Sequence, residues 1–135
     1  MGKLQEFLTA NKVENAVTTE VDIKPFPFPF VVKTITEAEN KVIRKSCQTT
    51  EYNKKTHQKE VQTDSQAYLT KLVVACTVDP CFKDAALQEA YGVVGAEALV
   101  EKLLTPGQYA ALLQAVNDIN SFDTDMQELV DEAKN

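Results

Sequence analysis

The residues of this 135-residue chain best suited to chemistry are three cysteines and a single histidine, His57. A thiolate beside an imidazole makes a nucleophile pair, and three cysteines with one histidine make a zinc-binding set. Structural zinc sites use closely spaced pairs of ligands, whereas four residues separate Cys76 from Cys81. A nucleophile pair would need Cys47 or another thiol brought against His57 and held by a third group. We therefore interpret the cysteines as small buried or half-buried thiols and His57 as an exposed histidine.

A run of carboxylates between residues 118 and 132 is the second group that could bind metal or transfer protons. These side chains follow helical spacing opposite an apolar stripe, and they lack the ligand order and glycine of an EF-hand. We interpret them as a solvated helix face, with a docking surface for a basic partner as the alternative. The "GVVG" at 92–95 lacks the lysine and hydroxyl residue that complete a phosphate loop. The sequence thus predicts no catalytic, cofactor-binding or metal-binding residues, and we expect the protein not to be an enzyme.

The charge of the chain is unevenly distributed along it. The net charge of −6 combines +2 in residues 1–63 with −8 in residues 64–135. An acidic half repels a phosphate backbone, so we expect no nucleic-acid partner. No apolar run approaches the ~20 residues of a membrane helix, and the start does not resemble a secretory signal. We expect a protein without a membrane partner, with free thiols, in the cytoplasm of the cell that makes it.

The stretch "KPFPFPFVVK" at 24–33 alternates proline with phenylalanine. Its prolines are two residues apart, whereas a P-x-x-P ligand needs a spacing of three. The prolines remove consecutive N–H donors from one edge, so we expect an edge strand here. Two hypotheses concern its rings: they pack onto the helices, or they form an exposed aromatic strand that receives a partner. They belong to Phe26, Phe28 and Phe30.

The apolar positions before this stretch and those within it differ in parity. Val21 and Ile23 are odd, while Phe28 and Phe30 are even, so one strand cannot keep both pairs on one face. The sequence therefore predicts a hairpin of residues 17–23 and 28–35 with a turn or bulge near Lys24–Pro27.

The remaining chain is typical of helices, after a short amphipathic helix with Leu4, Phe7 and Leu8 at its start. Capping boxes begin helices at Thr36 and Thr105, and a third helix follows Asp64 until Asp79–Pro80 ends it. Short helices are expected around 84–92 and 95–104, and a last one after residue 124. The side chains expected to point inward are Ala38, Val42, Ile43, Cys47, Tyr68, Leu69, Leu72, Val73, Cys76, Tyr91, Leu99, Leu103, Leu104, Tyr109, Leu112, Leu113 and Val116.

The sequence therefore predicts a single domain, 1–135, of a mainly α (α+β) class. Residues 1–35 would form the N-terminal helix and the small β-hairpin at about 17–35. Residues 36–135 would form a helical body interrupted by a polar, mobile loop at 48–63, which lacks apolar periodicity.

Several segments of the chain resemble the XkdN-like tail assembly chaperones of tailed phages and Gram-positive prophages. They include "TEAENKVIRKSC" (36–47), "YLTKLVVACTVDP" (68–80), "LQEAYGVVGAEALVEKLLTPGQYAALLQAVNDIN" (87–120) and "FDTDMQELVDEAKN" (122–135), together with the N-terminal "LQEFLTANKVENAV". The proline–phenylalanine run departs from the family, whose members have a longer and more polar hairpin before the helix at 36.

The resemblance implies a non-enzymatic chaperone in the cytoplasm of the bacterial host, one that binds the tape measure protein and acts with the tail tube protein before departing. A chaperone for long amphipathic helices needs apolar grooves and a charged body. The stripe of Met126, Leu129 and Val130, with Phe26, Phe28 and Phe30, is the expected partner-binding set. The same stripe could instead pack on Leu112 and Val116. The alternative function is a small prophage-encoded regulatory or nucleic-acid-binding helical protein, and the sequence leaves self-association open.

Overall fold

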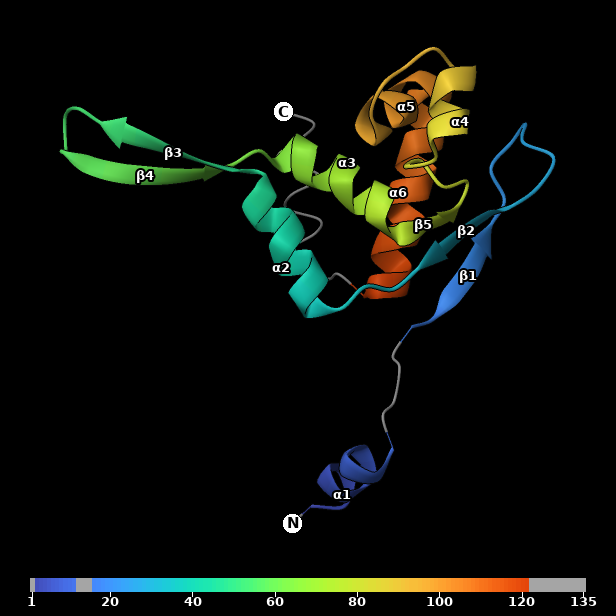
Figure 1. Ribbon diagram of the computed structural model, residues 1–135, viewed down its shortest axis with the longest axis horizontal. Coiled ribbons are helices and arrows are strands. Elements are labelled where there is room, and N and C mark those ends of the chain that lie inside the picture. The colour runs from blue at the N-terminus through green and yellow to red at the C-terminus, as the bar shows by residue number, and fades with distance from the viewer. Residues whose placement is uncertain (1, 12–15, 122–135) are drawn as a thin grey trace.

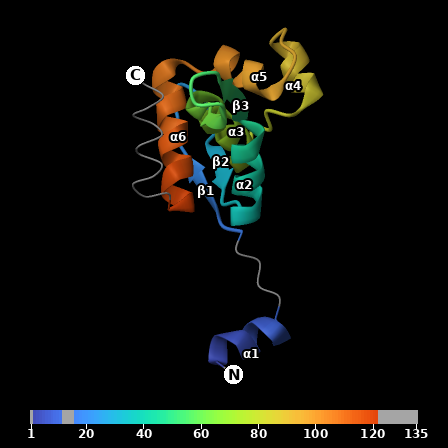
Figure 2. The ribbon, with the colours of Figure 1, turned by 90° about the vertical axis from the view of Figure 1, so that its left-hand side faces the viewer.

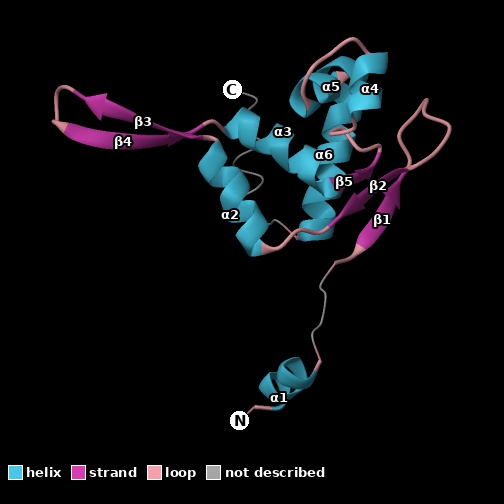
Figure 3. Ribbon diagram, in the orientation of Figure 1, coloured by secondary structure: helices cyan, strands magenta, loops and turns pink. Residues whose placement is uncertain are grey.

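The computed structural model describes residues 2–11 and 16–121, and its elements are drawn in Figures 1 and 3. In chain order they are α1 (Lys3–Ala10), β1 (Thr18–Val21), β2 (Phe30–Lys33), α2 (Glu37–Ser46), β3 (Gln48–Asn53), β4 (Gln58–Thr63), α3 (Ser65–Cys76), β5 (Thr77–Asp79), α4 (Ala85–Ala90), α5 (Ala96–Leu103) and α6 (Pro106–Asn120). Helices predominate among the described residues and the strands form small sheets, so the fold is mixed α+β.

Helix α3 forms the centre of the core. The five residues of this helix that were predicted to point inward are all buried, as the periodicity of the sequence indicates. They are Tyr68, Leu69, Leu72, Val73 and Cys76. They pack with Val32 of β2, Phe82, Leu99 of α5, and Leu112 and Val116 of α6. Figure 2 shows α2 and α6 on opposite sides, with α3 and the first sheet between them.

The first sheet is antiparallel, with the strand order β1-β2-β5. Strand β1 pairs with β2 from Thr18↔Lys33 to Val21↔Phe30. Strand β2 also pairs with β5, through Val31↔Asp79 and Val32↔Thr77. Phe30 and Val32 are buried, since alternate residues of a strand point to one face and α6 covers that face.

The helix starts follow the capping signals of the sequence. Thr36 and Thr105 each accept a hydrogen bond from the backbone N–H three residues on, and Glu39 and Gln108 accept one from the cap residue's N–H in return. Asp64 accepts from the N–H of Ala67 at the start of α3. These bonds satisfy backbone donors that a helix start leaves free.

The inward face of α2 differs from the prediction. Ala38 and Val42 are exposed, and the buried residue between them is Asn40, which is 3% exposed. Asn40 Oδ1 accepts a hydrogen bond from the hydroxyl of Tyr68 on α3, which satisfies the buried amide. The spacing of apolar residues alone does not predict that a polar residue is buried here. Ile43 is half-buried and Cys47 is buried, as expected.

Residues 48–63 are not the predicted polar loop. They form a second antiparallel sheet of two strands, β3 and β4, in register from Gln48↔Thr63 to Asn53↔Gln58. Threonine recurs there, together with Tyr52 and Val61, and such residues favour strands even where no apolar face is buried.

Two further expectations also need correction. Helix α3 ends at Cys76, three residues before the predicted stop, because residues 77–79 pair with β2. Tyr91 is 41% exposed instead of pointing inward. The helix predicted at the start of the chain is present as α1, with Leu4, Phe7 and Leu8 exposed on it, and it stands apart from the body in Figure 1. The predicted helix after residue 124 lies outside the described residues.

Replacing Tyr68 by Phe should lower the free energy of unfolding by about 1–3 kcal/mol, since it leaves the buried Asn40 Oδ1 without a donor. Urea unfolding followed by circular dichroism measures the change. Tyr52→Phe removes a hydroxyl from an exposed side chain and should change stability by less than about 0.5 kcal/mol. Equal losses in the two variants would contradict the role given to the buried pair.

Candidate functional site

The cysteines and the histidine do not meet in one place. Cys47 and Cys76 are buried, Cys81 is exposed, and all three thiols are free. His57 lies at the tip of the β3–β4 hairpin, where its Nδ1 is 3.0 Å from the Tyr52 hydroxyl. Cys47 immediately precedes β3, so a six-residue strand, about 20 Å long, separates it from the tip. This distance is incompatible with a nucleophile pair of these two residues.

Metal binding has no support in the described ranges, 2–11 and 16–121. Within them no three His, Cys, Asp or Glu side chains are grouped so that they could hold an ion. None of the helices described there is long and apolar enough to cross a membrane.

Cys76 serves the packing of the core. Burial raises the pKa of its thiol to about 11, and a hydrogen bond from Asn120 opposes that rise. Asn120 Nδ2 lies 3.6 Å from Cys76 Sγ, and Asn120 Oδ1 accepts from the N–H of Ile35 at 2.9 Å. Asn120 therefore ties the end of α6 to α3 and to the segment after β2, a role that no sequence pattern signalled.

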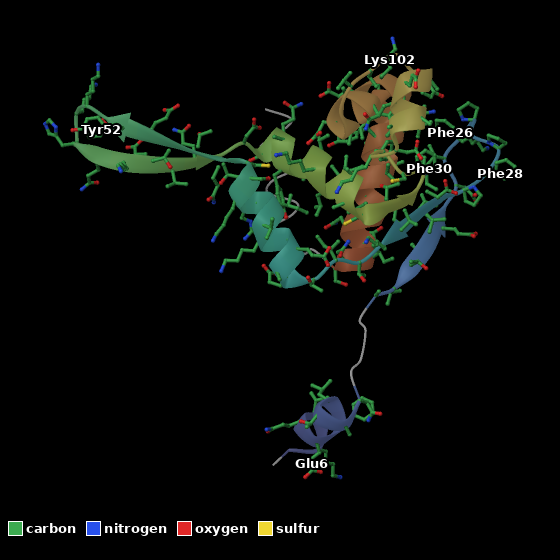
Figure 4. All side chains as sticks on the ribbon, viewed as in Figure 1. Glu6, Phe26, Phe28, Phe30, Tyr52 and Lys102 are labelled. Atoms are coloured by element: carbon green, nitrogen blue, oxygen red, sulfur yellow. The ribbon has the colours of Figure 1, made fainter. Side chains whose placement is uncertain are left out.

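The three phenylalanines of the proline-rich stretch have different environments. Phe30 is 3% exposed and Phe26 is half-buried, with its ring edge-on to Phe30 at a centroid distance of 5.1 Å. Phe28 is 78% exposed and points away from the body in Figure 4. The packing hypothesis therefore describes Phe26 and Phe30, and the exposure hypothesis describes Phe28.

The expected edge strand at the proline-rich stretch is wrong. Pro25, Pro27 and Pro29 all lie in the connection between β1 and β2, and β2 itself is the middle strand of its sheet. The missing N–H donors therefore affect no ladder hydrogen bond. The connection is held to the body where Gln108 Nε2 donates to the carbonyl of Lys24 at 2.9 Å. The predicted turn does lie in this region, between antiparallel strands.

A groove lies between α3, α5 and α6. Its volume is about 320 Å³, and its lining residues are Gln66, Thr70, Val100, Glu101, Leu104, Thr105, Pro106 and Tyr109. The Tyr109 hydroxyl lies 3.2 Å from Thr70 Oγ1, and burial raises the pKa of Tyr109. The sequence predicts Leu104 and Tyr109 to point inward, but no pattern in it signals the hollow that they line.

The second groove lies between α2, α3 and the start of α5, and its volume is about 200 Å³. Val74, Ala75 and Ala96 supply apolar surface, with Lys71, Lys83 and Glu97 among the other lining residues. Neither groove gathers the titratable groups that acid–base or nucleophilic catalysis requires. Met126, Leu129 and Val130, which we expected to bind a partner, lie outside the described residues.

Comparison with known proteins identifies the class to which the chain belongs. A family model described as the phage XkdN-like tail assembly chaperone protein matches residues 4–134. The chain belongs to this family, and the resemblance read from its sequence is confirmed.

Two proteins of Bacillus subtilis (strain 168) are similar to the chain. The XkdN protein of the phage-like element PBSX is 32% identical over 116 residues, which cover 85% of this chain and 78% of XkdN. The YqbN protein is 32% identical over 130 residues, covering 95% and 87%. The crystal structure of YqbN matches with a TM-score of 0.68 at 27% identity, over 91% of this chain and 99% of that one.

The variant Phe30→Ala should lose about 3–5 kcal/mol of unfolding free energy, because it opens a cavity in the core. Phe28→Ala, its matched control two residues away, should change stability by less than about 0.5 kcal/mol. Chemical denaturation measures both values. Comparable losses would show that Phe28 is packed as well.

Thiol titration with an aromatic disulfide reagent at pH 8 should detect one fast-reacting cysteine in the native protein and three after unfolding. The fast group is Cys81, since burial shields the other two and the pKa of about 11 keeps Cys76 protonated. Cys81→Ser should remove the fast phase. A fast phase that survives in this variant would contradict the assigned burial.

Proposed function

We propose that this protein binds the tape measure protein during phage tail assembly and promotes tail tube assembly before leaving the particle. The observation that carries the proposal is the match of the tail assembly chaperone family to residues 4–134. The protein would act without catalysis, in the cytoplasm of the bacterial host, and the tail tube protein would be a second partner.

The groove between α3, α5 and α6 supports this function because a side chain from the apolar face of an amphipathic helix could enter it. Pro106 and Tyr109 supply apolar surface, since Val100 and Leu104 are almost fully buried, while Gln66 and Glu101 supply polar groups. Apolar surfaces of this form bind the apolar face of a helix, and the polar groups around them fix its orientation.

The exposed ring of Phe28 is the second supporting feature. Aromatic side chains on a surface bury a large area when a partner covers them, and they are frequent among the residues that dominate binding. Phe26 and Phe30 would position the Phe28 connection, while Met126, Leu129 and Val130 remain proposed contacts. The −8 charge of residues 64–135 would keep the complex dispersed.

Co-expression with the tape measure protein of the same phage or prophage should raise the solubility of that protein and yield a complex that co-purifies. Phe28→Ser should weaken the complex by about tenfold or more if its ring is a binding hot spot. Val94→Ser is the matched control, because Val94 is a 95% exposed apolar residue elsewhere on the body. Binding measured by calorimetry should be unchanged in that control.

Failure of the wild-type proteins to co-purify, together with normal tail formation after deletion of the gene, would refute the proposed function. Duplex DNA binding with a steep salt dependence would instead favour the regulatory alternative. Equal binding by the Phe28 variant and its control would remove Phe28 from the site.

A further inference from the structure

The β3–β4 hairpin has an unusual place in this fold. It projects from the junction of α2 and α3 in Figure 3, and every residue of its two strands is exposed except Asn53, which is partly exposed. Among the described residues, no third strand pairs with either of its outer edges. A two-stranded hairpin in water is marginal, and a third strand or a packed face normally completes it. The hairpin therefore has the form of half of a larger sheet.

The backbone groups available on each edge follow from the register. Asp64 N donates to the carbonyl of Cys47 at 2.9 Å, so this pair is hydrogen-bonded. Bonded and non-bonded pairs alternate along an antiparallel ladder, which makes Thr50↔Val61 a non-bonded pair. The N–H and C=O groups of non-bonded residues point away from the partner strand. On the outer edge of β4 these groups belong to Lys59, Val61 and Thr63.

The β4 edge can pair antiparallel with the β4 edge of a second copy in one well-matched register. Registers centred on Lys59 or on Glu60 place two like charges opposite each other, and one centred on Gln62 places Glu60 opposite Asp64. A register centred on Thr63 directs the end of each strand into the start of the other copy's α3. Centring on Val61 pairs valine with valine and Lys59 with Thr63, and it places Glu60 opposite Gln62. No like charges are then directly opposite, and like-charge pairs are the ones that destabilise a sheet.

The charges near this edge are compatible with the register. Asn53 Nδ2 donates to Glu60 Oε1 at 2.8 Å, which holds the Glu60 carboxylate on the β3 side of the hairpin. Tyr52, Thr50 and Val61 share one face because their cross-strand pairs alternate with those of Glu51 and Glu60. Two copies would join these residues into one continuous strip across four strands.

We propose that two copies of this chain associate through the β4 edges of their hairpins. The product is a four-stranded antiparallel sheet in the order β3-β4-β4-β3, with Val61 on the two-fold axis and the helical bodies at its opposite ends. Hydrogen bonds of the outward backbone groups hold the two β4 strands together, which is strand addition by a second copy.

Sedimentation of the full chain over a range of concentrations should show a monomer–dimer equilibrium. Val61→Pro removes an N–H that points outward without removing a bond within the hairpin, and it should raise the dimer dissociation constant by about tenfold or more. Thr50→Pro makes the matching change on the outer edge of β3 and should leave dimerisation unchanged. A monomer at every concentration, or equal loss of dimer in both variants, would overturn the proposal.

Crosslinking gives a test that does not depend on how a proline is tolerated. Facing Cα atoms in a bonded antiparallel pair are about 5.5 Å apart, within the range of a disulfide. In a Cys81→Ser background, Val61→Cys should form a disulfide-linked dimer on oxidation with copper phenanthroline. Glu60→Cys, whose counterpart is not directly opposite, should remain largely monomeric. Equal crosslinking of both variants, or none at Val61→Cys, would overturn the register.

Discussion

The structure depends on the burial of one helix, α3, on several sides at once. Seven of its twelve residues are buried, including Tyr68, Leu72, Val73 and Cys76. Helices α2, α5 and α6 all contact it, and β5 continues directly from its end. An eight-residue helix such as α5 has little stability of its own in water, so it forms by packing against this scaffold.

The parts of the fold that the sequence predicted are those where local bonding and periodicity agree. The capping boxes at Thr36 and Thr105 gave the starts of α2 and α6, and the stripe of α3 gave its buried face. The predictions were wrong where contacts with distant segments determine the burial or the secondary structure of a residue. Asn40 is buried because Tyr68 supplies its hydrogen bond, and no spacing within α2 can show that. Residues 48–63 form strands whose faces are solvated, so their pattern lacked the apolar alternation by which a strand is usually found.

The candidate site was predicted only in part, for a related reason. The proline–phenylalanine stretch was identified as a distinctive surface, but the depth of each ring depends on contacts made from distant segments. Phe30 is buried because α6 packs against β2. Phe28 precedes β2, in the connection from β1, and its side chain is exposed. The groove between α3, α5 and α6 arises from the way three helices meet, and such a hollow has no signature within any one of them.

A partner that binds helix α1 would have to offset the conformational entropy lost when this helix is ordered. It has eight residues and none of them is buried, and an isolated helix of that length is only marginally formed in water. A partner that covers Leu4, Phe7 and Leu8 must therefore also supply the free energy that keeps the helix ordered, about 1–2 kcal/mol for each residue fixed. The affinity gained from this apolar face is smaller than its area suggests. Any attachment through α1 would therefore be easy to reverse.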